Sequence, residues 1–365
     1  MSDTCLIGGL PVVSLELPVP SRGDARGFSR AVVLPGRGAA ILQLKARIPG
    51  LGETDVFTAP SPEQAALVMN GGALDFNGNA SFSLGAAILA PYANRIRGVY
   101  SAANRTIETP IRDRRIHLPA NGGGKQPGAE PCALHGLILD RPVDSYEHRT
   151  SRSEDAFSAV LRAGDFGWGW PSRISLAFEV VLRAERFRLQ VTATNTGDEP
   201  SPLGLGWHPY FALPSGNRSQ ARLSLPVRRR LIVNNYDEVL PTGEMVGVSA
   251  TRYDFATPGG LELGDLFLDD CFVDIQKTAG GYTVCEIIDP MAAYGLRMIA
   301  RSKEVTAIQT YAPLDAAYVA VEPQFNWANP FGTEWPRSVE TGMVLLEPKQ
   351  SVTYLVDLEL FEPQP

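Results

Sequence analysis

The sequence predicts an all-β protein in which sheets pack face to face, and two observations support this prediction. Apolar and polar residues alternate with a period of two in long segments of the chain, which is the pattern of strands that bury one face. The 35 glycines and 29 prolines are scattered through the 365 residues, as they are where many short strands are joined by turns. No internal repeat and no low-complexity linker divides the chain, so residues 1–365 are predicted to form a single domain.

The alternation is clearest in residues 42–48, 174–182, 187–193 and 352–360. Side chains on a strand project to opposite faces in turn, so each segment offers one apolar face to a core between sheets. Residues 183–186 lie between the second and third of these segments. Those two segments are therefore predicted to form an antiparallel hairpin.

Helical signals are few. Ser61-Pro62-Glu63 precedes the segment Gln64–Met69, and a serine cap followed by proline at the first helical position predicts one short helix there. Nothing else in the chain sustains a period of 3.6 residues. The glycine-rich segment Asn121–Gly128 is predicted to be a long surface loop.

The charge balance argues against two classes of partner. Lysine and arginine number 33 and aspartate and glutamate 40, which gives a formal net charge of −7. Nucleic acids and anionic membranes attract clustered positive charge, so neither is expected as the main partner. The only dense basic run, Arg228-Arg229-Arg230, is predicted to lie in a solvated loop.

The cysteines and the N-terminal residues indicate where the protein works. The four cysteines (Cys5, Cys132, Cys271 and Cys285) include no Cys-x-x-Cys pair, and so few in so long a chain make no disulfide framework. No basic stretch precedes Leu6 as it would in a signal peptide, and no apolar run approaches the ~20 residues of a transmembrane helix. The expectation is a soluble cytoplasmic protein.

Only four histidines are present, and each is a candidate for proton transfer because imidazole titrates near neutral pH. His148 lies in a polar stretch and His117 in a basic one, so both are predicted to lie at the surface. His208 is crowded by aromatic residues and a proline, which suits either a core histidine or a functional one. His135 directly precedes Gly136, whose missing side chain allows close approach of the backbone.

Three further positions combine a charge with an apolar strand-like context. Glu322 ends an apolar run directly before a proline, and partial burial there would raise its pKa toward that of a base useful near neutrality. Asp269 and Asp270 enter another apolar run, where one is predicted to point inward and the other outward. Arg95 follows Asn94 and stands between apolar neighbours, as an ion-pair partner or as a donor to substrate oxygens.

Taken in order, these segments resemble the aldose 1-epimerase (galactose mutarotase) family. The resemblance runs from about Arg30 to the C-terminus and rests on seven segments: Pro91–Ile96, Leu118–Asn121, Leu134–Gly136, Gly206–Phe211, Leu268–Phe272, Val321–Gln324 and Gly342–Pro348. It implies a large antiparallel β-sandwich, the supersandwich of that family. It also implies an enzyme that interconverts the α and β anomers of a free aldose without a cofactor or a metal ion.

The resemblance assigns a role to individual residues. It implies that Glu322 is the general base, that His208 is the general acid, and that His135 and Arg95 hold the sugar, with Asn94 beside them. Asp269 is implied to bind sugar hydroxyls. The expected partner is a monosaccharide, and the expected assembly is a monomer or a homodimer.

The implied mechanism needs an ionised carboxylate and a protonated imidazole in the free protein. A bell-shaped dependence of kcat/KM on pH is then expected, with its lower limb from Glu322 and its upper limb from His208.

Three alternative functions remain open on the residues alone. His135, His208 and Glu322 could hold a metal as two histidines and one carboxylate. The chain could be a sugar-binding or regulatory protein without turnover. It could also act on a sugar phosphate, which would place basic residues such as Arg97 or Lys125 in the site.

Three points within the site also stay open. Asp270 competes with Asp269 for the sugar, since a histidine is common in the family where Asp270 stands. Neither the 122–128 loop nor the segment Phe325–Phe331 has an assigned role. The preferred aldose is not indicated.

Overall fold

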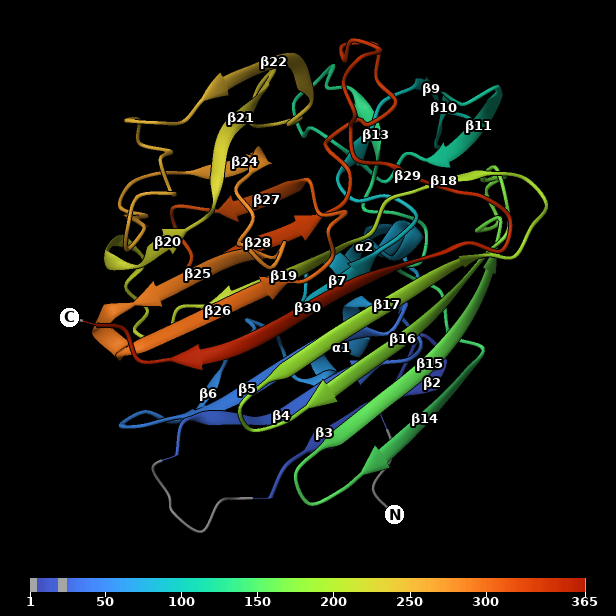
Figure 1. Ribbon diagram of the computed structural model, residues 1–365. Coiled ribbons are helices and arrows are strands. Elements are labelled where there is room, and N and C mark those ends of the chain that lie inside the picture. The colour runs from blue at the N-terminus through green and yellow to red at the C-terminus, as the bar shows by residue number, and fades with distance from the viewer. Residues whose placement is uncertain (1–4, 19–24, 365) are drawn as a thin grey trace.

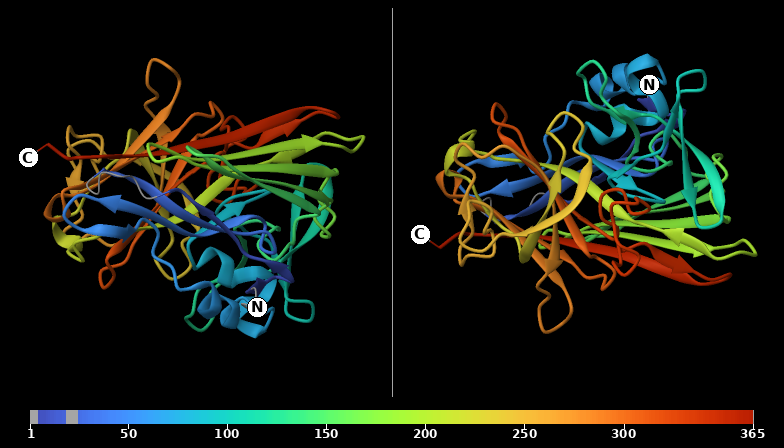
Figure 2. Two further views of the ribbon diagram at one scale, coloured as in Figure 1. Left: turned by 90° about the horizontal axis from the view of Figure 1, so that it is seen from below. Right: turned by 90° about the horizontal axis from the view of Figure 1, so that it is seen from above.

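The computed structural model describes residues 5–18 and 25–364. The first four residues, on which the expectation about a leader partly rests, lie outside this described part. Within it, two large antiparallel sheets form the protein, and Figure 2 shows them as stacked layers with the helices beside one of them. The prediction of an all-β sandwich is confirmed.

The first large sheet has nine strands in the described residues. Figure 1 shows most of it in front. Its order across the sheet is β14 (Ser145–Thr150), β15 (Asp155–Gly164), β16 (Ile174–Leu182), β17 (Phe187–Asn195), β30 (Ser351–Phe361), β26 (Tyr294–Ala300), β25 (Thr283–Asp289), β20 (Arg222–Ser224) and β23 (Leu261–Glu262).

The second large sheet carries the candidate site. Its order is β22 (Pro241–Gly247), β21 (Val227–Val233), β24 (Leu268–Ile275), β27 (Ala307–Ala312), β28 (Tyr318–Gln324), β19 (Gly206–Ala212), β7 (Ala86–Leu89), β5 (Ala40–Ile48), β4 (Gly27–Leu34) and β3 (Val13–Glu16), with β6 (Gly52–Asp55) paired to β5. All its strand pairs are antiparallel.

Smaller ribbons and short helices complete the described chain. The ribbons are β1 (Leu6–Ile7) with β2 (Leu10–Pro11), β9 (Val99–Ser101) with β10 (Thr106–Ile111) and β11 (Arg114–Pro119), β8 (Arg95–Ile96) with β13 (Pro131–Leu134) and β12 (Gly122–Gly123), and β18 (Ser201–Leu203) with β29 (Val344–Leu346). The helices are α1 (Pro62–Val68) and α2 (Asn79–Phe82), with the 3₁₀ turns η1 (Ala73–Gly78), η2 (Arg218–Gln220) and η3 (Pro290–Ala292).

The strands predicted from the period-two pattern are all present. Residues 42–48, 174–182, 187–193 and 352–360 lie in β5, β16, β17 and β30. Their burial alternates as expected; β16, for example, alternates strictly between buried and more exposed positions. The hairpin over 183–186 is also confirmed, since Arg183 and Arg186 exchange backbone hydrogen bonds.

The predicted helix is confirmed as well. Ser61 caps α1: its hydroxyl accepts from the backbone of Gln64, and the Gln64 side chain accepts from the backbone of Ser61. This reciprocal capping box satisfies two backbone donors at the helix start. The sequence did not indicate η1 and α2, because helices of one or two turns are too short to show a 3.6-residue period.

Two loop predictions need correction. Arg228–Arg230 lie within strand β21 rather than in a loop, where they alternate across the sheet. Gly122 and Gly123 form β12 and pair with β13, so the glycine-rich segment is partly a strand. Glycine suits this ribbon because a Cβ on Gly122 would lie only 2.8 Å from the Leu134 side chain.

The core lies between the two large sheets. Trp207 on β19 stacks on Phe187 of β17 with ring centroids 6.1 Å apart, and Phe57 packs edge-on against both. All three side chains are buried. Since Trp207 points into this core, its neighbour His208 points to the outer face of the second sheet. In the described residues, no helix is long and apolar enough to cross a membrane.

Candidate functional site

Three polar side chains lie side by side on neighbouring strands of the second sheet. Gln309 on β27 is directly opposite Glu322 on β28. The pairs Gly206↔Gln324 and Tyr210↔Ala320 on either side place His208 on β19 opposite Glu322. Directly opposite residues share one face of a sheet, so the strand register brings these groups together on the outer face.

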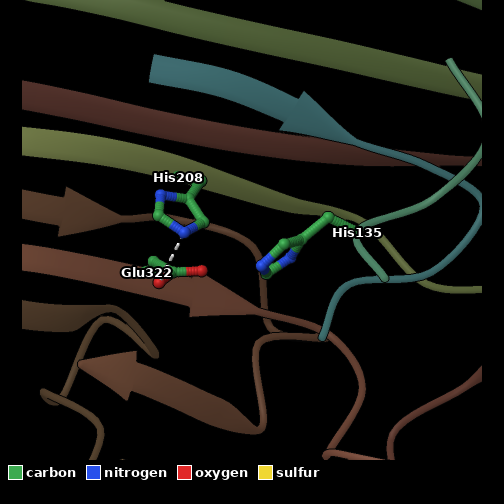
Figure 3. A group of neighbouring side chains, drawn as sticks. All are labelled: His135, His208 and Glu322. Atoms are coloured by element: carbon green, nitrogen blue, oxygen red, sulfur yellow. Dashed lines mark ion pairs between the residues drawn. The ribbon is translucent and has the colours of Figure 1, made fainter. Parts of the chain in front are cut away.

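Glu322 and His208 form a buried pair. The Nε2 atom of His208 lies 3.3 Å from Oε1 of Glu322, and the two side chains are 6% and 1% exposed (Figure 3). His135 approaches from a loop on the other side (Figure 3), with its ring perpendicular to that of His208 and 4.9 Å away between centroids. The structure thus brings together three of the residues predicted for the site.

A sharp backbone turn presents His135. His135 and Gly136 have φ angles of 59° and 86°, in the left-handed region. A Cβ on Gly136 would meet the Ala90 carbonyl oxygen at 2.3 Å, so glycine is required there. The backbone N–H of His135 donates to the carbonyl of Asn94, and Phe82 of α2 packs 5.0 Å from its ring.

Arg95, Asp269 and Gln309 form a second polar group beside the pair. The guanidinium of Arg95 lies 3.5 Å from the carboxylate of Asp269, which also accepts from Gln309 Nε2 at 2.6 Å. Asn94 is buried behind this group: its amide donates to Gln309 and its carbonyl oxygen accepts from the backbone of Arg95. Asn94 therefore orients Arg95 and Gln309, and it is not among the residues that line the cavity. Direct binding of the sugar by Asn94 stays a prediction, and this buried position argues against it.

The two adjacent aspartates face opposite sides of the sheet. Asp269 lines the cavity, whereas Asp270 pairs with Arg230 at 2.6 Å and accepts from Tyr236. This is the alternation predicted from the sequence. Of the two, Asp269 is the one available to a ligand.

The segment Phe325–Phe331 holds the chain that carries Arg95. The amide of Asn326 accepts from the backbone N–H of Ala93 and donates to the Ala93 carbonyl. The backbone of Asn329 donates to the carbonyl of Arg95, and its side chain accepts from the backbone of Arg97. The segment Phe325–Phe331, for which no role was indicated, thus holds residues 93–97 in place through these hydrogen bonds.

The glycine-rich loop reaches the cavity at Lys125. The carboxylate of Asp237 accepts from the backbone N–H groups of Lys125 and Gln126. A Cβ on Gly124 would lie 2.1 Å from that carboxylate, so a larger residue there would have to displace the Asp237 side chain. Lys125 lines the rim of the cavity, whereas Arg97 pairs with Glu130 outside it.

The site encloses a cavity of about 590 Å³. Five of its lining residues were not singled out for the site by the sequence: Gln309, Tyr210, Tyr311, Tyr318 and Phe82. Tyr210 lies inside the quoted segment Gly206–Phe211, two residues after His208. Gln309 is a polar residue in an apolar strand, which is the one local signal that could have indicated it.

Burial sets the protonation of the central groups. Loss of water lowers the pKa of His208 to about 4 and that of His135 well below its usual value. Burial also raises the pKa of Glu322 well above its usual value, Asp269 adds to this, and Arg95 opposes it. The charged form of each group is disfavoured because a buried charge loses its hydration.

These pKa shifts bear on one prediction. The free protein was expected to hold an ionised Glu322 beside a protonated His208. Burial opposes both of these charges, because it lowers the pKa of His208 and raises that of Glu322, and so it favours the arrangement in which Glu322 holds the proton. Both arrangements carry one proton on the pair, so they differ only in which of two groups 3.3 Å apart holds it.

The same three residues could also hold a cation. One ligand atom from each of His135, His208 and Glu322 lies within 4.8 Å of the others. Two imidazoles and one carboxylate suit several transition metals. The buried Nδ1 atoms of His135 and His208 have no hydrogen-bond partner in the part of the chain that is described.

The other two histidines lie away from the site. His117 is exposed on β11, as predicted. His148 is on β14 and was predicted to be solvated; it is 38% exposed, but its Nε2 lies 2.7 Å from the buried carboxylate of Asp155. His148 is therefore not purely solvated, because it pairs with Asp155 of the neighbouring strand β15 at the edge of the first sheet.

Comparison with solved structures shows the same architecture in known proteins. A galactose mutarotase-like protein from Clostridium acetobutylicum superposes with a TM-score of 0.71 at 18% identity, over 92% of this chain and 93% of that one. The galactose 1-epimerase of Lactobacillus acidophilus NCFM gives 0.65 at 17% identity, over 97% and 100% of the two chains. At such identities the likeness concerns the fold.

Two curated relatives match part of the sequence. Uncharacterized protein YphB of Escherichia coli (strain K12) is 38% identical over 138 residues, which are 37% of this chain and 40% of that protein. Maltose epimerase of Levilactobacillus brevis is 28% identical over 173 residues, 43% of this chain and 47% of that protein. The matched segments thus span less than half of either relative.

A model of a whole protein family matches much more of the chain than these two relatives do. The family model described as aldose 1-epimerase matches residues 62–358, which include every residue of the site described above. The resemblance found in the sequence segments is therefore confirmed, and the chain belongs to the aldose 1-epimerase family.

Proposed function

We propose that this protein is an aldose 1-epimerase that interconverts the α and β anomers of a free aldose. The observation that supports this most strongly is the buried pair of Glu322 and His208, 3.3 Å apart in a cavity that Arg95, His135 and Asp269 also line. A carboxylate and an imidazole are the proton acceptor and donor that anomer exchange requires. Family membership and the name of the maltose epimerase relative agree with this proposal.

In the proposed reaction, Glu322 removes the proton of the C1 hydroxyl group. The electron pair of that O–H bond forms the carbonyl at C1, the bond from C1 to the ring oxygen breaks, and the ring oxygen takes a proton from His208. Rotation about the C1–C2 bond then presents the other face of the carbonyl. The same two groups work in reverse to close the ring, so neither proton nor electron is gained or lost overall.

The single proton on the pair is consistent with this cycle. The cycle begins from an ionised Glu322 and a protonated His208, which the free site disfavours by burial. One proton transfer over 3.3 Å converts the favoured form into the reactive one. Arg95 is the nearby cation that stabilises the ionised carboxylate, because its charge lowers the pKa of Glu322.

A metal-dependent reaction is the second candidate, and the grouping of His135, His208 and Glu322 is the observation in its favour. Dialysis against a strong chelator separates the two: the proton-transfer proposal expects an unchanged rate. Loss of activity that one divalent metal restores would support the metal site.

The alternative of a sugar phosphate has limited support. Of the two basic residues named for it, Arg97 is paired with Glu130 outside the cavity and only Lys125 lines the rim. Arg95 already lies beside Asp269. A neutral free sugar therefore suits this cavity better than a dianion does. We further propose a reducing cytoplasmic location, which the four unpaired cysteines suit.

Polarimetry of freshly dissolved α-sugars tests the proposal and also the alternative of a binding protein without turnover. The panel is glucose, galactose, xylose, arabinose and rhamnose. An aldose 1-epimerase accelerates the approach to the equilibrium rotation of at least one of them. Binding of a sugar without any acceleration, measured by calorimetry on the same preparation, would replace the proposal with a sugar-binding function.

A further inference from the structure

The glycine-rich loop beside the cavity, residues 122–130, is held by the loop that joins β21 and β22. The carboxylate of Asp237 accepts from two successive backbone N–H groups, that of Lys125 at 2.8 Å and that of the next residue at 3.0 Å. The carboxylate of Glu238 accepts from the backbone N–H of Glu130 at 2.9 Å. Two points of the glycine-rich loop are therefore fixed by hydrogen bonds to neighbouring acidic side chains.

The β21–β22 loop is in turn attached to the strand that carries Asp269. Tyr236, the residue before Asp237, donates a hydrogen bond to Asp270 on β24 at 3.1 Å. Asp270 is buried and directly follows Asp269 in that strand. The backbone of Lys125 is thus linked, through one short loop, to a strand that lines the cavity.

The charge of Lys125 has no ion-pair partner in the described residues, unlike the charges of neighbouring arginines. Three arginines near the cavity each pair with a carboxylate: Arg95 with Asp269, Arg97 with Glu130 and Arg230 with Asp270. Lys125 is exposed and lines the cavity. Its ammonium group carries three N–H donors, which are therefore available to a ligand.

Depth within the cavity decides which part of a sugar Lys125 faces. Glu322 and His208 are 1% and 6% exposed and lie at the floor, whereas Lys125 lies at the exposed rim. In a pyranose ring, C4 lies across the ring from C1, and C6 is carried by C5, the neighbour of C4. A sugar whose C1 atom lies at the floor therefore turns the oxygens on C4 and C6 toward the rim.

We propose that Lys125 is a specificity-determining residue that donates a hydrogen bond to the oxygen on C4 or C6 of the aldose, and that Asp237 is a positioning residue for Lys125. This role rests on the proposed function, because it takes C1 to lie at Glu322 and His208. The contact is remote from the reacting atoms, so it is equally strong in the ground state and in the transition state. Its loss should then raise KM and leave kcat unchanged.

Deoxy sugars test the contact. Mutarotation of the faster-reacting of glucose and galactose, and of its 4-deoxy and 6-deoxy analogues, is followed by polarimetry with wild-type protein and with Lys125→Met. Methionine keeps most of the length of the side chain and removes its charge and its donors. For the wild type, one of the two analogues should have a KM about fivefold or more above that of the parent hexose, because a hydrogen bond to a charged group is lost. In Lys125→Met, the KM of the hexose should rise by the same factor, and the hexose and that analogue should then differ by less than about twofold.

Asp237→Ala tests the positioning role. Alanine releases the backbone of Lys125, so KM for the hexose should rise about threefold or more with kcat unchanged. Added to Lys125→Met, the same substitution should have no further effect on KM, because Asp237 acts only through Lys125. Asp237→Asn keeps one of the two acceptor oxygens and should lie between the wild type and Asp237→Ala.

Gln126→Ala is the matched control. Gln126 follows Lys125, and its backbone N–H is also held by Asp237. Its side chain is exposed and is not among the residues that line the cavity. This variant should have the KM and the kcat of the wild type for all three sugars.

Several results would overturn the proposal and leave the proposed function intact. An unchanged KM in Lys125→Met, or an equal rise for the hexose and both analogues, would refute the contact. A further rise in KM when Asp237→Ala is added to Lys125→Met would refute the positioning role, as would an Asp237→Ala protein that melts at a lower temperature but keeps a normal KM.

No acceleration of any sugar would instead refute the proposed function. Calorimetric titration of glucose and galactose into wild-type protein and Lys125→Met would then decide the contact alone. Weaker binding by Lys125→Met supports it, and equal affinities of the two proteins contradict it.

Discussion

Burial governs the chemistry of Glu322 and His208. Each pKa moves toward the neutral form, with that of His208 lowered to about 4 and that of Glu322 raised. The active form holds one proton on the pair. As pH falls through the lower pKa the pair gains a second proton, and as pH rises through the higher pKa it loses the only one.

We therefore predict a bell-shaped dependence of kcat/KM on pH whose lower limb, near pH 4, reflects His208 and whose upper limb reflects Glu322. NMR titration of the free protein tests the assignment, with His208→Asn used to identify the His208 resonance. His208 should stay neutral from pH 7 down to about 5. A His208 that is already protonated at pH 6 would contradict the account of burial.

Arg95 is predicted to act in binding. Its guanidinium lines the cavity and lies 3.5 Å from Asp269, so it can donate to sugar oxygens in both the ground and the transition state. In Arg95→Ala, KM should rise about tenfold or more, at least as much as kcat falls, because a charged hydrogen bond is lost. Steady-state kinetics measure this effect.

The control for this variant is Arg97→Ala, which removes a neighbouring arginine that pairs with Glu130 outside the cavity. Its kinetics should be those of the wild type. If Arg95→Ala lowers the melting temperature but its folded fraction keeps a normal KM, then Arg95 is a structural ion-pair partner and the binding role is wrong.

Among the segments of the site, the turn at His135-Gly136 depends most on one residue. Gly136 combines a φ of 86° with contact to Ala90, where an added Cβ would lie 2.3 Å from the carbonyl oxygen. Gly136→Ala should therefore destabilise the protein by about 3 kcal/mol or more and displace His135. Chemical denaturation and kinetics of the folded variant measure both effects.

Gly128→Ala is the matched control. Gly128 has a φ of 85°, but nothing lies within 4 Å of an added Cβ. Only the backbone strain of about 1–2 kcal/mol is then expected, with normal kinetics. Equal losses of stability in the two variants would mean that the contact with Ala90 does not restrain the turn.

The elements show which parts of the site were accessible from the sequence. Period-two alternation identified β5, β16, β17 and β30, and the Ser61 cap identified α1, because these signals are local. Which of Asp269 and Asp270 faces the cavity could be decided only once the pairing of β24 with β27 was known. Gln309 and Tyr311 are near the pair only because β27 lies beside β28, and no local pattern reports strand neighbours.

Local sequence patterns also could not predict that the pKa of His208 is lowered and that of Glu322 is raised. These shifts depend on how completely the outer face is covered by α2, the turn at His135 and the residue 93–97 segment. These parts come from distant regions of the chain, and their contacts with the sheet form only in the folded protein.

The molecule as a whole has one large apolar core that joins both sheets. The core cluster contains Phe157 of β15 and Leu358 of β30 together with Ile41 of β5 and Phe272 of β24. A shared core couples the unfolding of both layers, so we predict a single cooperative thermal transition. Calorimetry should give equal calorimetric and van 't Hoff enthalpies. Two resolved transitions, or a proteolytic fragment that melts independently, would show that residues 1–365 are not one domain.

The measurement that most directly tests the account is mutarotation by Glu322→Gln, alone and combined with His208→Asn. Glutamine keeps the size and hydrogen-bonding capacity of the side chain but cannot accept the C1 hydroxyl proton as a base. We predict that Glu322→Gln folds, binds sugar, and loses about 10² or more in kcat. His208→Asn should lose a similar factor, and the double variant far less than the product of the two, because the groups act as a unit. A folded Glu322→Gln protein with near-wild-type mutarotation would contradict the assignment of Glu322 as the base.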